Sequence, residues 1–191
     1  MQHNKNFIID NKHFNYLLDV VWLLTIGIFG RLILHVPNVT PITGLSLFSG
    51  ATLSRGIALS VVFVAMFVSD LCLSFIFGYP IIGYFSLFTY SGFAMIVLVS
   101  SKLRYSRTTF PFYVLTMSCG YWVWTNFGVW LTGNLYPKTL AGFGLCYYLA
   151  LPFLRNAIVG DLVCSYLIFG VFYFLAIQKD AGGREMKVFS R

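Results

Sequence analysis

Long apolar stretches separated by short polar breaks make up most of the chain between residues 14 and 177. A hydrocarbon core about 30 Å thick requires roughly 20 apolar residues for each helical crossing. Five stretches have about that length, namely residues 16–35, 56–77, 81–100, 110–131 and 156–177. The pattern therefore predicts an all-α, polytopic membrane helical bundle.

Two further apolar stretches are shorter. Residues 42–54 and 140–151 would each rise only about 18 to 20 Å as α-helices. Thr40 is a good N-cap for the first of them, and Pro41 fits its first turn. This stretch also carries small residues that permit close approach of neighbouring backbones, namely Gly44, Ser46, Ser49, Gly50 and Ala51. We expect a short helix buried in the bundle.

Basic residues give the orientation, because short loops rich in Lys and Arg stay cytoplasmic. Lys102, Arg104 and Arg107 mark one inner loop, and both tails are basic. An even number of crossings before this loop requires residues 42–54 to cross; otherwise one terminus changes side. Residues 140–151 are then a re-entrant or interfacial helix on the outer face. We expect about six crossings, with both termini cytoplasmic.

In this topology the chain is one membrane domain with two short tails. The tails are residues 1–13 and the basic residues 178–191, and the membrane domain is residues 14–177. The first apolar stretch is longer than the apolar region of a signal peptide and is not followed by a cleavage site. We expect it to remain in the protein as a helix.

The composition agrees with a membrane protein and excludes several other classes. Of the 191 residues, 58% are hydrophobic, 19% aromatic and only 10% charged, whereas about 25% charged residues is typical of soluble domains. The net charge of +7 comes from scattered basic residues, which argues against nucleic-acid binding. The four cysteines lack CxxC spacing, and P-loop, HExxH and GxSxG motifs are absent. We expect no metal, no cofactor and no enzymatic activity.

Charged residues within the apolar stretches are the first candidates for function. An ionisable group there costs roughly 2.5 kcal/mol or more unless it is paired or hydrated. Arg31 and His35 lie one turn apart at the outer end of the first helix, and Asp70, Arg155 and Asp161 fall at a similar depth. Arg31 could pair with Asp70 or with Asp161. Such charges either fasten helices together or line a substrate pocket, and the two roles are compatible.

The stretch at 110–131 adds aromatic residues and an amide. Trp122, Asn126 and Trp130 follow at steps of four and so share one helix face. An aromatic belt at the lipid interface explains Trp130. Asn126, flanked by Trp122 and Tyr121, could hold a flat polar molecule by stacking and hydrogen bonding. The alternative is a plain hydrogen bond between helices.

Several sequence blocks carry a family resemblance. They are residues 31–51 (RLILHVPNVTPITGLSLFSGA), 69–70 (SD), 125–131 (TNFGVWL), 136–139 (YPKT), 146–147 (CY), 151–153 (LPF) and 160–161 (GD). With these blocks the chain resembles a bacterial family of small multi-pass membrane proteins of unknown function, usually labelled as candidate transport proteins. The resemblance covers most of the chain beyond residue 30 and implies a protein of the bacterial inner membrane.

In size, crossing number and short second helix, the chain is also similar to the substrate-binding (S) subunits of energy-coupling factor transporters. This resemblance implies a separate energy-coupling transmembrane protein and ATPase subunits as partners. Those S subunits typically carry small residues, often alanine, at every fourth position of the first helix to engage the coupling protein. Here that helix has no alanine, and only Gly27 and Gly30 are small near its middle.

We therefore expect a substrate-capture subunit for uptake of a small polar, ring-containing molecule from the outer face. The expected substrate-binding residues are Arg31, His35, Asp70, Tyr121, Trp122, Asn126, Arg155 and Asp161. One alternative is a proton-coupled secondary carrier in which Asp70 or Asp161 titrates. Others are a non-transport membrane scaffold and, last, an intramembrane aspartyl enzyme.

Overall fold

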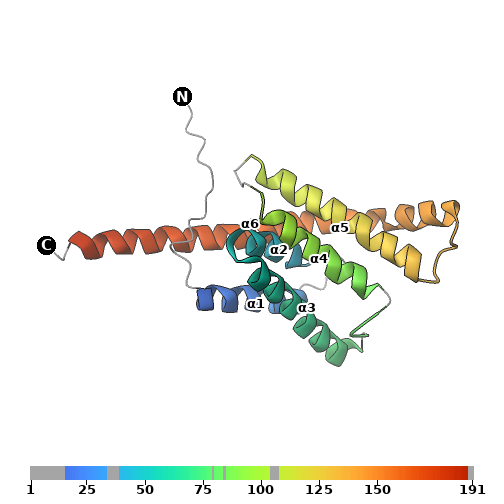
Figure 1. Cartoon of the computed structure of the whole chain (residues 1–191), viewed down its shortest axis with the longest axis horizontal. Helices are drawn as coiled ribbons and strands as arrows, with labels where there is room; N and C mark the ends of the chain where they lie inside the picture. Colours follow the sequence, from blue (N-terminus) through green and yellow to red (C-terminus); the bar gives the residue numbers. More distant parts are fainter. Residues whose placement is uncertain (1–15, 34–38, 79, 84, 104–107, 189–191) are drawn as a thin grey trace.

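The computed structural model describes residues 16–33, 39–78, 80–83, 85–103 and 108–188, with side chains described as far as Leu175. These residues form six α-helices and no strand, which confirms the predicted all-α class (Figure 1). The helices are α1 (Tyr16–Ile33), α2 (Ile42–Thr52), α3 (Arg55–Phe77), α4 (Ser86–Ser100), α5 (Phe110–Thr132) and α6 (Leu140–Val188).

Two of these helices are long and apolar enough to cross a membrane, namely α3 and residues Leu140–Leu175 of α6. Helix α4 is apolar but has only 15 residues. It was expected to begin at residue 81 and instead begins at Ser86, because the chain turns after Pro80. The Gly83 backbone N–H donates to Ser86 Oγ at 2.8 Å, which closes that turn.

The expectation of a separate re-entrant or interfacial helix at residues 140–151 is wrong. These residues are the first turns of α6, which continues through Pro152. A proline inside a helix removes one backbone donor, whereas ending the helix would leave several backbone groups without partners. Helix α5 also ties this region together, because Trp122 Nε1 donates to the Ala150 carbonyl at 3.1 Å.

Helix α2 is the buried centre of the bundle. Residues 41–50 are all buried, and α2 packs against each of the other five helices (Figure 1). A Cβ atom on Gly44 would lie 2.9 Å from Ser165 Cα, and one on Gly50 would lie 2.5 Å from the Val97 carbonyl oxygen. The predicted buried helix with close backbone contacts is confirmed, except that Ala51 is exposed.

The start of α2 is fixed by local hydrogen bonds. Thr40 Oγ1 accepts from the Ile42 backbone N–H at 3.0 Å, although the N-cap position falls on Pro41, one residue later than predicted. The first hydrogen bond of the helix runs from the Leu45 N–H to the Pro41 carbonyl, at 2.8 Å. Pro41 thus serves as an acceptor, so its missing N–H leaves no unpaired group.

Helices α2 and α6 run in the same direction. Gly44 lies against Ser165, and one turn further along both helices Phe48 contacts Phe169, with ring centroids 5.0 Å apart. This register also brings Thr43, the residue before Gly44, next to Asp161, one turn before Ser165 on α6. The candidate site below depends on that placement.

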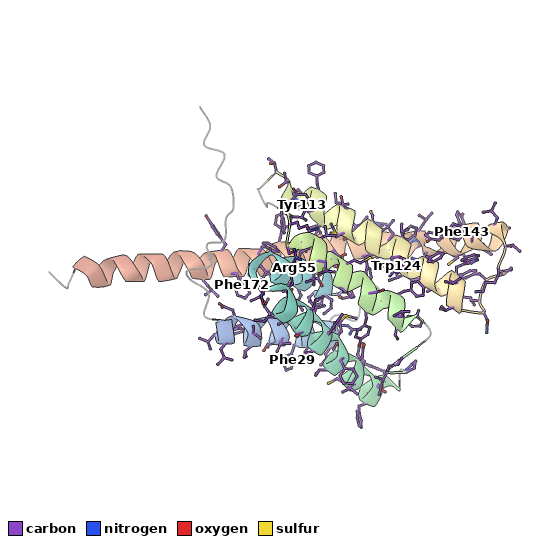
Figure 2. The ribbon with its side chains drawn as sticks, in the orientation of Figure 1. Phe29, Arg55, Tyr113, Trp124, Phe143 and Phe172 are labelled. Carbon is purple, nitrogen blue, oxygen red and sulfur yellow. The ribbon has the colours of Figure 1, made fainter. Side chains whose placement is uncertain are left out.

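The outside of the bundle is apolar, and much of its polar chemistry is inside. Large exposed apolar side chains occur on all helices except α2, for example Trp22, Phe67, Leu98, Phe112 and Leu167. Figure 2 shows side chains projecting outward along the helices, and carbon predominates in them. Polar side chains are buried instead, including those of Ser69, Ser118, Asp161 and Ser165. The interior thus combines an apolar core with buried polar groups, while large apolar side chains cover much of the exterior.

The close approach at Gly50 gives a first prediction. Gly50→Ala should lower the free energy of unfolding by about 1–3 kcal/mol, since its Cβ must displace the α4 backbone. Gly120→Ala is the matched control, because no atom lies within 4 Å of its added Cβ, and it should leave stability unchanged or slightly raised. Thermal unfolding of the detergent-purified proteins measures both. Equal midpoints for the two variants would contradict the close packing of α2.

Candidate functional site

An ion pair joins α1 to α3. Arg31 Nη1 lies 2.7 Å from Asp70 Oδ1, and the two side chains are 19% and 18% exposed. Of the two partners expected for Arg31, Asp70 and Asp161, the structure selects Asp70, and this is the one ion pair between residues that the structure describes. Because both side chains keep part of their surface accessible, a small molecule could contact the pair from outside.

Neighbouring polar groups hold the pair in place. Arg31 Nη1 also donates to Ser69 Oγ at 2.8 Å, and Ser69 in turn bonds back to its own helix at the Ala65 carbonyl. On the other side, the Tyr90 hydroxyl donates to Asp70 Oδ2 at 2.7 Å. Both carboxylate oxygens are thus engaged, and the network connects three helices, α1, α3 and α4.

Tyr121 on α5 lies between this ion pair and a second polar centre. Its ring stacks on Phe93 of α4 with centroids 4.3 Å apart, and its hydroxyl bonds to the Thr89 side chain. The charged groups within electrostatic range of its phenol are those of Arg31, Asp161 and Asp70. Of the predicted aromatic site residues, Tyr121 is the one that the structure places beside the charges.

The second polar centre is Asp161 on α6, which is only 5% exposed. Its Oδ2 lies 2.5 Å from Ser118 Oγ on α5, and the Thr43 side chain on α2 supplies another hydrogen bond. Gly160 lies against Val39, just ahead of α2, so this part of α6 meets the first turn of that helix. Arg31 pairs with Asp70 instead of Asp161, so the two acids occupy separate settings.

Trp122 and Asn126 face α6. The amide Nδ2 of Asn126 donates to the Trp122 carbonyl of its own helix at 2.8 Å. The Trp122 ring meets Tyr147 edge-on, with centroids 5.2 Å apart. These contacts place Trp122 and Asn126 on the side of α5 away from Phe93 and the ion pair.

Arg155 and His35 complete the predicted set. Arg155 is exposed and forms no ion pair with any residue in the described part of the chain. His35 lies outside the described residues. The structure thus brings Arg31, Asp70 and Tyr121 together.

Four hydroxyl-bearing partners were not among the predicted site residues, namely Thr43, Ser69, Tyr90 and Ser118. Ser69 directly precedes Asp70, so its place beside the charge was open to sequence reasoning. The other three lie on helices remote in sequence from the acid that each one contacts. No local spacing indicates such contacts.

Comparison with known families gives one match. A family model described as a family of unknown function, DUF6580, matches residues 11–182. The chain belongs to the DUF6580 family. This agrees with the expected membership of a family of unknown function. No curated protein and no solved structure matches the chain, so the function of this DUF6580 protein is argued from its geometry.

The ion pair gives a second prediction. Arg31→Met should lower the free energy of unfolding by about 2 kcal/mol, between the values for fully buried and fully exposed pairs. The double variant Arg31→Met with Asp70→Leu should recover part of this loss, because it leaves no unpaired charge. Thermal unfolding in detergent measures the effect.

The matched control for this prediction is Arg55→Met at the exposed start of α3. It should change stability by less than about 0.5 kcal/mol. If Arg31→Met and Arg55→Met unfold at the same temperature, the pair does not hold α1 against α3.

Proposed function

We propose that this chain is an integral membrane protein with several helical crossings. Its apolar exterior supports this, because large exposed apolar surfaces mark contact with lipid or partners. The long apolar helices α3 and α6 are consistent with it. The basic inner loop and tails favour cytoplasmic termini, and the parallel register of α2 and α6 agrees with that topology, in which both helices run inward.

Within this bundle, we propose that the protein binds a small polar solute for transport. The observation that carries the proposal is the partly exposed Arg31–Asp70 pair, held by Tyr90 and flanked by Tyr121. Ionisable residues inside membrane segments are rare, and those that occur mark substrate or ion pathways. A bound ring-containing molecule would find opposite charges for its polar groups and a phenol for stacking.

The position of the pair supports capture from the outer face. Arg31 lies in the last turn of α1, and Asp70 lies in the second half of α3, which begins at Arg55. In the proposed topology Arg55 and Lys102 are on the cytoplasmic side, so the pair lies toward the opposite surface. Uptake would then begin with binding at this centre.

The small residues of α1 indicate whether a separate coupling protein could bind this helix. A Cβ on Gly27 would lie 2.8 Å from Leu45 Cδ2, and a Cβ on Gly30 would lie 2.6 Å from Pro41 Cγ. Both small residues therefore face the chain's own α2. A coupling protein like that of the energy-coupling factor transporters would have to engage another surface. This observation favours a second candidate, a self-contained secondary carrier.

Native mass spectrometry of the detergent-purified protein tests solute binding. The wild-type chain should carry a small-molecule adduct, and Arg31→Gln should lose it, because the charge that holds the solute is gone. Arg55→Gln makes the same chemical change at an exposed position and should retain the adduct. A folded Arg31→Gln protein with an unchanged adduct would contradict the proposed site, and a wild-type protein without adduct would contradict a capture subunit.

A further inference from the structure

Asp161 is a buried acid that the proposed solute site does not use. Its carboxyl group is enclosed by three helices, yet no cationic side chain in the described part of the protein pairs with it. An unpaired carboxylate in such a place is costly, and the usual remedy is a proton or a counter-ion. The hydrogen bonds around the group distinguish these two remedies.

Ser118 Oγ has two acceptor oxygens within hydrogen-bond distance but only one proton to donate. Ser118 Oγ lies 2.9 Å from the Val114 carbonyl and 2.5 Å from Asp161 Oδ2. A serine hydroxyl carries one proton, which makes one strong hydrogen bond and is weakened when two acceptors share it. We propose that Asp161 is a proton-binding site, with the proton on Oδ2 donated to Ser118 Oγ, so that Ser118 donates to Val114.

The surroundings of Asp161 on each packed element agree with a neutral acid. Helix α2 presents Thr43, α5 presents Ser118 and Tyr121, and α6 itself presents Cys164 within electrostatic range. The two titratable groups in this set, the phenol and the thiol, are neutral in their ordinary forms at neutral pH. None of these side chains is a cation that would keep the acid ionised.

A buried hydroxyl without a hydrogen-bond partner lies on the same helix face as Asp161. Ser165 lies one turn after Asp161 on the same face of α6, is fully buried, and its Oγ has no hydrogen-bond partner. This Oγ is 3.0 Å from the position of a Cβ on Gly44, the residue next to Thr43. When the proton leaves, Ser165 can donate to the carboxylate. The site therefore offers the carboxyl group a hydrogen-bond partner in both the protonated and the ionised state.

Proton binding at Asp161 stands by itself, and its coupling to transport rests on the proposed function. Tyr121 is within electrostatic range of Asp161 and of the Arg31–Asp70 pair. A change of charge at Asp161 would therefore change the electrostatic potential at the solute site. This arrangement assigns the proton of a coupled carrier to Asp161, while Asp70 forms the ion pair with Arg31.

Infrared spectroscopy of the full chain in liposomes tests the proposal, with pH as the variable and the proton as the ligand. The carbonyl band of a protonated carboxylic acid should be present at mildly acidic pH, where exposed carboxyl groups are already ionised, and disappear as the pH is raised. Asp161→Asn should lack this band, and Asp70→Asn should keep it. A wild-type spectrum without the band, or a band that survives in Asp161→Asn, would overturn the proposal.

Two serine variants sharpen the test. Ser165→Ala removes a donor to the carboxylate, so the band should persist to a pH about one unit higher, equivalent to the loss of one hydrogen bond. Ser46→Ala is the matched control, because Ser46 is another buried hydroxyl without a partner, one turn before Gly50 on the side of α2 that faces α4. It should leave the pH midpoint unchanged, and equal shifts in both variants would overturn the role of Ser165.

A third variant covers the case in which Asp161→Asn does not fold. Ser118→Ala removes the acceptor of the proposed proton, so the carbonyl band should move in frequency, and an unmoved band would count against the hydrogen bond. The infrared result does not depend on any solute. An unchanged mass-spectrometric adduct in Arg31→Gln would therefore refute the solute site while leaving the Asp161 proton standing.

Discussion

The fold depends on enclosing one short helix inside a bundle whose exterior is apolar. Helix α2 can be surrounded because glycines at Gly44 and Gly50 let α6 and α4 approach its backbone. Helix α1 contributes two further close contacts through its glycines. Gly27 lies against Leu45 of α2, and Gly30 lies against Pro41, the residue before α2. With no room for larger side chains at these contacts, the rotation of each helix is fixed, and so is the direction in which its polar residues point.

That enclosure separates two acids with different physical settings. Asp70 lies near the surface of the bundle, paired with Arg31 and bonded to Tyr90. Asp161 lies deeper, among hydroxyl groups of α2 and α5. A charged pair with accessible surface suits a polar solute, and a buried acid among hydroxyls suits a proton. Asp70 and Asp161 both lie within electrostatic range of the Tyr121 phenol.

Composition and local pattern were sufficient for the all-α class and the buried short helix, and they limited the partner of Arg31 to Asp70 or Asp161, because each follows from the cost of placing polar groups in apolar surroundings. The choice of Asp70 needed the packing of α1 against α3. Composition and local pattern failed at the division between residues 140–151 and 156–177, because whether a helix continues through a proline such as Pro152 depends on contacts from a neighbouring helix. They also grouped Trp122 and Asn126 with the charges, although consecutive helix residues point about 100° apart. Packing turns Tyr121 toward α4 and Trp122 toward α6. Tyr90 and Ser118 were missed because contacts between distant helices leave no local spacing.

The central claim is that the Arg31–Asp70 centre opens to the outer face of a membrane bundle. Cysteine labelling in intact cells with a membrane-impermeant thiol reagent tests it most directly, after replacement of the native cysteines Cys72, Cys119, Cys146 and Cys164. Asp70→Cys should react in intact cells, and Arg55→Cys should react only after the cells are permeabilised. Labelling of Arg55→Cys in intact cells, with Asp70→Cys protected until permeabilisation, would contradict the account.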